Sequence, residues 1–202
     1  MRRLVAGGAL LFALFRPGLA EAKDFRVHRD WAFPRHAAEL VAILADYTDM
    51  CDHGCRYHAP TVAKAVVLSY RATPNDFYVW TSTDDIQDSS WFSHVTIQQT
   101  EHRAHLEFKM VPEDLADQLE KTTRLENDPA TDTCSVTYDI VEEYLDGKFV
   151  RSAVSFTTTV RLGGIAAWIG GGIVTGRLSD AAHAVYLDLR DAKPPPWFGA
   201  TK

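Results

Sequence analysis

The sequence predicts an α+β fold in which a curved, seven-stranded antiparallel sheet grips a long C-terminal helix. Three observations predict this fold. Apolar residues between Ile173 and Leu189 recur at a spacing of three and four, which is typical of one buried face of a helix. The middle of the chain instead alternates apolar and polar residues with a period of two, as half-buried strands do. Short polar turns join these segments, so neighbouring strands should run antiparallel.

The elements follow one another in a simple order. Residues 24–33 alternate and predict a first strand, and helical spacing then runs from Pro34 to about Thr48. The polar residues 49–60 form either a second short helix or an ordered loop. Residues 112–124 predict a further short helix, with Leu115 and Leu119 on one side. The six remaining strands are predicted at residues 62–72, 77–83, 91–100, 104–110, 134–145 and 148–161.

Two turn signals frame the end of the chain. Asp146-Gly147 between the last two strands is a strong hairpin signal. The long apolar segment then covers residues 163–192, and three prolines from Pro194 end it. Fully helical, this segment would be roughly 45 Å long. Its charged residues fall mostly away from the apolar stripe: Arg177, Asp180, Asp188 and Arg190.

The first 22 residues are expected to be a signal peptide. Arg2 and Arg3 precede an apolar run, and Ala20-Glu21-Ala22 is a small-x-small cleavage pattern. The run is shorter than the roughly 20 residues that span a bilayer, which favours a cleaved leader over an anchor. We therefore expect a periplasmic or secreted protein.

The remaining chain suits one domain at residues 23–193, followed by a tail at 194–202. Trp197 and Phe198 would allow this tail to dock back onto the domain. Cleavage removes three arginines and one glutamate, so the net charge changes from −6 to −8. Such an acidic balance argues against nucleic acid or an anionic membrane surface as the main partner.

The order strand, two helices, six strands and long helix resembles the START-like superfamily, also called helix-grip or Bet v 1-like. The resemblance covers residues 24–192. It rests on the element order, on the stretch from Tyr78-Val79-Trp80 through Ser89-Ser90-Trp91-Phe92, and on the hairpin before the final helix. It implies a cavity between the sheet and that helix, which usually holds a lipid or another apolar molecule. Many members carry such ligands, and some are cyclases or dehydratases.

The predicted function is therefore an exported protein that holds a hydrophobic ligand, a lipid above all, for carriage or transfer. Hydrophobic small molecules or lipids are the expected partners, with transient membrane contact and no nucleic acid or cofactor. The alternative is a small cyclase- or hydrolase-type enzyme acting on an apolar substrate in the same cavity. That alternative predicts an inward-facing carboxylate or histidine with a perturbed pKa.

Aromatic side chains are the main candidates for the cavity wall, because ligand pockets are mostly apolar with few polar groups. The same residues would also suit an ordinary closed core. Arg177 would hold a head group or carboxylate through paired hydrogen bonds, or it would pair with Asp180. The predicted ligand-binding residues are Tyr78, Trp80, Trp91, Phe108, Tyr138, Phe156, Trp168 and Arg177.

Three adjacent glycines, residues 170–172, conflict with a helix, since each costs on the order of 1 kcal/mol relative to alanine. They indicate a hinge that lets the first half of the segment act as a lid, close packing against the sheet, or a loop before a helix that begins near Ile173. The hinge would control ligand exchange.

Other chemical patterns are weaker. A cluster of possible metal ligands lies at Cys51, His53, Cys55 and His58. The two cysteines form a disulfide or remain thiols, or the four residues bind a metal ion. The spacing of the four matches no common zinc pattern. We predict no metal site and a free Cys134. No catalytic arrangement is predicted either. The candidates for an acid or base in the cavity are His94, Glu107 and Glu142.

Overall fold

A computed structural model describes residues 22–46, 62–83, 89–163 and 171–195. Predictions about other positions lie outside the described residues. These are the signal peptide up to residue 21, the cysteine and histidine cluster at residues 51–58, Trp168, Gly170 and the tail from residue 196.

The described residues form seven strands and three helices in the predicted order. The strands are β1 (Lys23–Phe33), β2 (Val62–Thr73), β3 (Asp76–Thr83), β4 (Ser89–Gln99), β5 (Arg103–Met110), β6 (Thr133–Leu145) and β7 (Lys148–Leu162). The helices are α1 (Ala37–Leu44), α2 (Glu113–Thr123) and α4 (Gly171–Asp191). None of these helices is long and apolar enough to cross a membrane.

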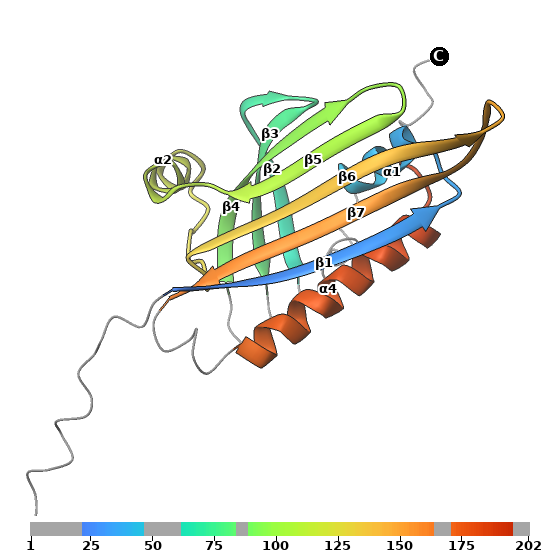
Figure 1. Ribbon diagram of the computed structural model, residues 1–202. Helices are drawn as coiled ribbons and strands as arrows, with labels where there is room; N and C mark the ends of the chain where they lie inside the picture. Colours follow the sequence, from blue (N-terminus) through green and yellow to red (C-terminus); the bar gives the residue numbers. More distant parts are fainter. Residues whose placement is uncertain (1–21, 47–61, 84–88, 164–170, 196–202) are drawn as a thin grey trace, which may run out of the picture.

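All seven strands form one sheet in the order β1-β7-β6-β5-β4-β3-β2, and every neighbouring pair is antiparallel. Consecutive strands pair from β2 to β7, with α2 in the connection between β5 and β6, while β1 pairs with the last strand. Figure 1 shows the sheet curving past α1 and α4, with α2 on its other side. The predicted curved antiparallel sheet with a long C-terminal helix is confirmed.

The hairpin between β6 and β7 turns at the predicted residues. Asp146 has φ = 50° and Gly147 has φ = 73°, so both central residues adopt left-handed backbone conformations. Two-residue hairpins with this geometry match the twist of the flanking strands, and Asp-Gly is a preferred pair for them. The turn fixes the pairing of Leu145 with Lys148 and so aligns the two strands.

One face of the sheet, here called the inner face, packs against α1 and α4. Leu40 and Leu44 of α1 and Leu189 of α4 are almost completely buried there. They meet alternate residues of the strands, among them Phe33, Val95, Leu106, Ile140, Val154 and Phe156. This single apolar layer is the main core of the molecule.

The opposite face, here called the outer face, carries a second and smaller core under α2. Ala116 and Leu119 of α2 pack against Leu68, Trp80 and Phe92. The Trp80 indole N–H donates a hydrogen bond to the carbonyl oxygen of Glu126, 2.8 Å away, in the segment that follows α2. The polar tip of this tryptophan is thus satisfied as it is buried.

The start of α4 favours one interpretation of the glycines. The helix begins at Gly171, and a Cβ added there would lie 3.0 Å from Cε1 of Phe25 in β1. Gly171 therefore allows close packing of the helix on the sheet, which was one of the three predicted reasons. Gly172 and Gly176 have open space at the same position, and the other half of the predicted lid lies outside the described residues.

Alanine substitutions separate packing from helix propensity. Gly171→Ala should lower the free energy of unfolding by about 1 kcal/mol, because the buried Phe25 ring must shift. Gly176→Ala, in the helix interior with free space, should raise it by about 0.5–1 kcal/mol. Urea unfolding of both variants measures the difference. An equal gain in both would show that the contact with Phe25 does not restrict position 171.

Candidate functional site

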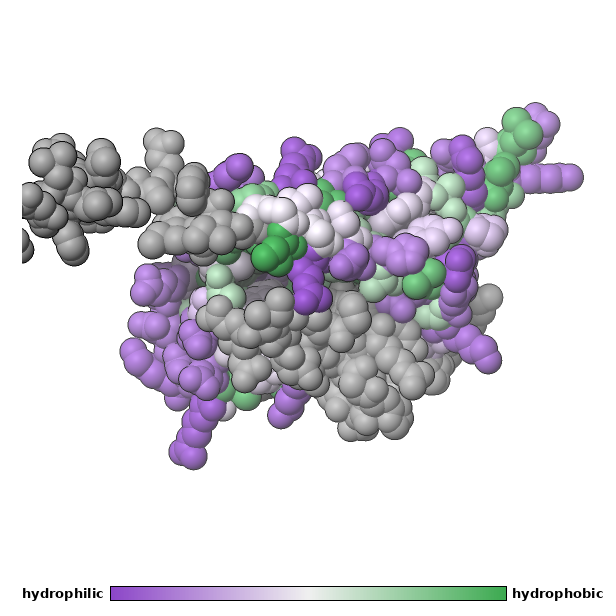
Figure 2. Space-filling model, turned by 90° about the horizontal axis from the view of Figure 1, so that it is seen from below, coloured by the Kyte–Doolittle hydropathy of each residue, from purple (hydrophilic) through white to green (hydrophobic). Residues whose placement is uncertain are grey.

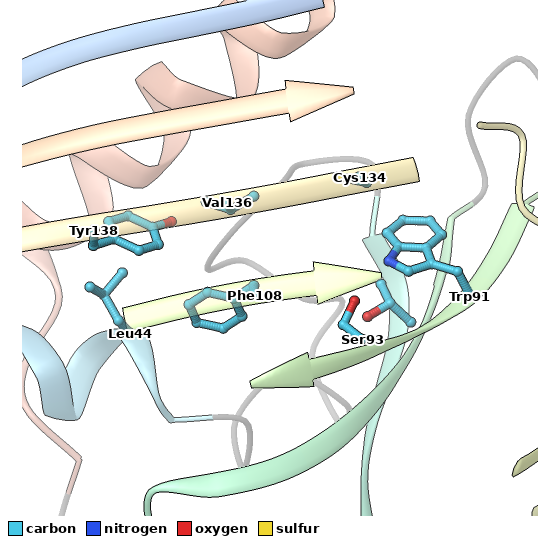
Figure 3. A pocket seen from close by; sticks show the side chains of 8 residues that line it. Leu44, Trp91, Ser93, Phe108, Cys134, Val136 and Tyr138 are labelled. Carbon is cyan, nitrogen blue, oxygen red and sulfur yellow. The ribbon is translucent and has the colours of Figure 1, made fainter. Parts of the chain in front are cut away.

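A hollow of about 130 Å³ lies on the inner face, between the sheet and the end of α1. Figure 3 shows Leu44 and Tyr138 at one end, Trp91 at the other, and Phe108 between them. Three alternate residues of β6 contribute to one wall. The lining residues are Leu44, Thr81, Trp91, Ser93, Phe108, Cys134, Val136 and Tyr138.

Strand alternation and register bring these side chains together. Successive residues of a strand point to opposite faces, so every second residue of β6 from Cys134 to Tyr138 lines the hollow. Thr81 lies opposite Trp91 between β3 and β4, and Phe108 lies opposite Val136 between β5 and β6. The site is therefore fixed by pairing across four strands and by Leu44 at the end of α1.

The lining is mainly apolar and aromatic, with a few neutral polar groups. The polar groups of the wall are the hydroxyls of Thr81, Ser93 and Tyr138, the thiol of Cys134 and the indole N–H of Trp91. Burial raises the pKa of Cys134 to about 11, so the thiol is protonated at neutral pH. A protonated thiol is a poor nucleophile, and the wall is better suited to contact apolar groups than to attack them.

Asp188 of α4 is a half-buried carboxylate next to Leu189 of the main core. The Oδ2 atom of Asp188 is buried and, in the part of the chain that the structure describes, has no hydrogen-bond partner. Burial, followed by the nearby charge of Asp191, raises the pKa of Asp188 to about 7. Sequence reasoning assigned Asp188 to the polar side of the helix. That was wrong for this oxygen, because Asp188 directly precedes the fully buried Leu189 at the edge of the apolar stripe.

Tyr138 connects the hollow with Asp188. Its side chain lines the hollow, and its hydroxyl lies toward the Val136 side in Figure 3. Burial, and then the charge of Asp188, raises the pKa of Tyr138 well above its usual range. The phenol therefore stays neutral, and the carboxylate of α4 is near enough to act on it electrostatically.

The structure brings together four of the eight predicted ligand-binding residues. Trp91, Phe108 and Tyr138 line the hollow, and Phe156 lies behind Tyr138 with its ring centroid 5.3 Å away. Phe156 also stacks on Trp31 of β1, which sequence reasoning did not select.

The other predicted residues lie elsewhere. Tyr78 and Trp80 do share a strand face, but it is the outer face, where both belong to the cluster under α2. Arg177 is exposed on α4, and Trp168 lies outside the described residues. The alternation of β3 showed that Tyr78 and Trp80 face one way, but only the neighbouring strands and helices define which way that is.

The candidate acids and bases do not line the hollow either. His94 lies on the outer face, stacked on Tyr78, with Nε2 2.7 Å from a carboxylate oxygen of Asp76. Glu107 pairs with Thr137 on the same face. Glu142 faces inward, but at the far end of β6, where it is occupied with structural hydrogen bonds.

Glu142 anchors the start of α1. Its carboxylate accepts a hydrogen bond from the Ala37 backbone N–H at 2.8 Å and from His36, His102 and Tyr144. Burial alone would raise the pKa of Glu142, but these hydrogen bonds outweigh it and hold the pKa at about 2. A carboxylate satisfied in this way stays ionised and stabilises the helix N-terminus.

The surface around α4 carries few exposed hydrophobic groups. Seen from the side of α4, the described surface is mostly hydrophilic, with hydrophobic residues at single positions and at the tip of the β6–β7 hairpin (Figure 2). Ile173 is 62% exposed on α4, and Leu145 is 68% exposed at the hairpin. Within the described ranges, no group of three or more histidine, cysteine or acidic residues is placed to hold a metal ion.

Comparison with known proteins supports the fold. No family model matches the chain, and no curated protein is similar in sequence. Among solved structures, the chain is similar to the aromatase/cyclase Zhui from Streptomyces sp. R1128, with a TM-score of 0.54, 14% identity, and coverage of 83% of this chain and 92% of that one. Human STARD10 gives a TM-score of 0.50 at 10% identity, covering 80% of this chain and 63% of that one.

A third similar structure is the di-domain aromatase/cyclase StfQ of the steffimycin biosynthetic pathway. Its TM-score is 0.51 at 10% identity, and the match covers 83% of this chain and 50% of that one. The predicted resemblance to the START-like, helix-grip or Bet v 1-like superfamily is thus confirmed at the level of the fold. At these identities, the match defines the fold and leaves the function to be argued from the site.

The buried carboxylate predicts an unusual pH dependence of stability. The pKa of Asp188 is 3.8 unfolded and about 7 folded, so folding favours its protonated form. Its destabilising effect is absent below pH 3.8 and complete above pH 7. Asp188→Asn should therefore be about 1–2 kcal/mol more stable than the native protein at pH 8, after allowance for partial exposure, and no more stable at pH 4.

Urea unfolding at the two pH values measures this difference, with Asp191→Asn as the control. Asp191 is exposed and bridged to Arg190. Its removal should give a much smaller gain at high pH than Asp188→Asn, because it relieves only the weaker of the two causes that raise the pKa of Asp188 and breaks the ion pair with Arg190. A stability difference between Asp188→Asn and the native protein that is the same at pH 4 and pH 8 would contradict the burial argument.

Proposed function

We propose that this protein binds an apolar small molecule, or the apolar part of a lipid, between its sheet and its inner helices. The observation that carries the proposal is the hollow lined by Leu44, Trp91, Phe108, Val136 and Tyr138. Aromatic and aliphatic walls with few polar groups are typical of small-molecule sites. Binding would be driven mainly by burial, at roughly 25 cal/mol per Å² of apolar area.

The size of the hollow limits what it holds. Its volume of about 130 Å³ is below the roughly 300–1,000 Å³ of ordinary ligand pockets. An apolar cavity of about 150 Å³ holds a molecule as small as benzene. The described hollow therefore suits one ring or a short alkyl segment, and the rest of a longer lipid would extend beyond it.

The N-terminal sequence supports a role outside the cytoplasm. A basic start, an apolar run and the Ala20-Glu21-Ala22 pattern together suit export to the periplasm or the medium. There the protein would sequester its ligand from water and carry or transfer it, with transient membrane contact at delivery. Recovery of a mature chain that begins at Lys23 from the periplasm or medium would support export, and an uncleaved cytoplasmic chain would refute it.

A small enzyme acting on an apolar substrate is the second candidate. Asp188 is the observation that favours it, since a buried carboxylate with a pKa of about 7 can both accept and donate a proton near neutral pH. Because two of the similar structures are aromatase/cyclases, the reaction of this candidate enzyme would be of the cyclase type. Recovery of ligand unchanged after prolonged incubation favours binding, whereas a new product favours the enzyme.

Filling the hollow tests the binding proposal. Val136→Phe adds a ring inside the hollow and should weaken binding of the neutral fluorescent probe N-phenyl-1-naphthylamine at least about tenfold. Leu44→Phe should act in the same direction from the opposite wall. Fluorescence titration gives the dissociation constants, and thermal unfolding confirms that each variant is folded.

Thr137→Phe is the matched control, because neighbouring residues of a strand point to opposite faces. It adds the same ring to the outer face of β6 and should leave the dissociation constant unchanged within about threefold. Equal probe binding by the native protein, Val136→Phe and Leu44→Phe would place the probe elsewhere and reject this hollow as the site.

A further inference from the structure

Asp188 is a half-buried carboxylate, and the fold leaves one of its oxygens without a described hydrogen-bond partner. Its Oδ2 atom is inaccessible and has no partner among the described residues. An unpaired buried carboxylate costs free energy, and proteins retain such groups mainly at functional sites. Asp188 is not among the residues that line the hollow.

The two arginines at the C-terminal end of α4 interact with groups other than Asp188. Arg190 holds Asp191 through two hydrogen bonds of 2.6 and 2.5 Å. Arg35, just before α1, approaches the same end of α4, but it donates to Glu39 at 2.9 Å and to the carbonyl oxygen of Arg190 at 3.0 Å. Within the described residues, neither arginine is hydrogen-bonded to the buried oxygen of Asp188.

The position of Asp188 relates it to the hollow. Tyr138 lines the hollow on the sheet side, and the same tyrosine is close enough to Asp188 for the two groups to interact electrostatically. Leu44 and Tyr138 form one end of the hollow in Figure 3, and α4 lies behind that end. Tyr138 is thus the residue that relates the hollow to Asp188.

We infer that Asp188 binds the polar end of the ligand, and that this end is a hydrogen-bond donor, with a protonated amine preferred. The apolar body lies in the hollow, and the head group donates to the carboxylate of Asp188. An alcohol makes the same bond without the charge. A carboxylic acid is disfavoured because its carboxylate and that of Asp188 repel each other. This inference rests on the proposed binding function and adds the chemical class of the ligand.

Three probes with one alkyl chain test it: octylamine, 1-octanol and octanoic acid. Calorimetric titrations at pH 8 and 150 mM salt should rank the native protein's affinity as amine, then alcohol, then acid. A charge-assisted hydrogen bond corresponds to roughly a tenfold to hundredfold preference for the amine over the alcohol. The salt screens the long-range attraction between the acidic protein and any cation.

Asp188→Asn should remove this preference while the alcohol still binds within about threefold of its native affinity. The variant is expected to fold, because it replaces an unpaired buried charge with a neutral group of the same shape. Asp191→Asn removes the same charge from an exposed position one turn away and should preserve the ranking. It separates the local contact from the effect of net charge.

The outcomes distinguish the two proposals. Loss of the amine preference in Asp188→Asn alone supports the inference. Binding of all three probes with the same ranking in native protein and Asp188→Asn overturns it and leaves the binding function standing. Equal loss of the preference in Asp191→Asn also overturns it, because the effect is then one of net charge. Absence of binding by all three probes overturns both proposals.

Discussion

The apolar inner face of the sheet is the constraint on which the rest of the structure depends. Alternate residues of seven strands point to this face, and the sheet alone cannot shield them from water. The short helix α1 covers one part with Leu40 and Leu44, and α4 covers another with Val185 and Leu189. Pairing of β1 with β7 places the first strand beside α4 (Figure 1), so both ends of the described chain contribute to one core.

The same packing produces the candidate site. The helices do not fill all the space above β4, β5 and β6, and the remaining hollow has apolar walls. Interiors are otherwise close-packed and their polar atoms paired, so the hollow and the unpaired Oδ2 atom of Asp188 are two specific features of this core. Asp188 is expected to lower stability as the pH rises from 3.8 to about 7, whereas Glu142, on the same face, accepts hydrogen bonds from several groups. Of these two carboxylates, Asp188 is the one that leaves an oxygen without a described partner, and it is the one proposed to bind the ligand.

Sequence patterns were sufficient for the fold because each strand alternates clearly and each turn has its own signal. The Asp146-Gly147 hairpin and the element order were predicted from local chemistry alone. The site was predicted only in part. Trp91, Phe108 and Tyr138, selected as ligand-binding residues, line one hollow. Tyr78 and Trp80 lie on the outer face, since alternation separates two faces without saying which one a helix covers. Asp188 was missed because helical spacing placed it at the border of the stripe, where burial depends on tertiary packing.

Analysis of the molecule that accompanies the protein tests the central claim most directly. The mature protein is purified under native conditions, extracted with organic solvent, and the extract is examined by mass spectrometry beside one from Val136→Phe prepared in the same way. The account predicts one apolar class of compound in near-stoichiometric yield from the native protein and a much lower yield from the variant. Equal yields of the same compound from both proteins would contradict binding in the hollow.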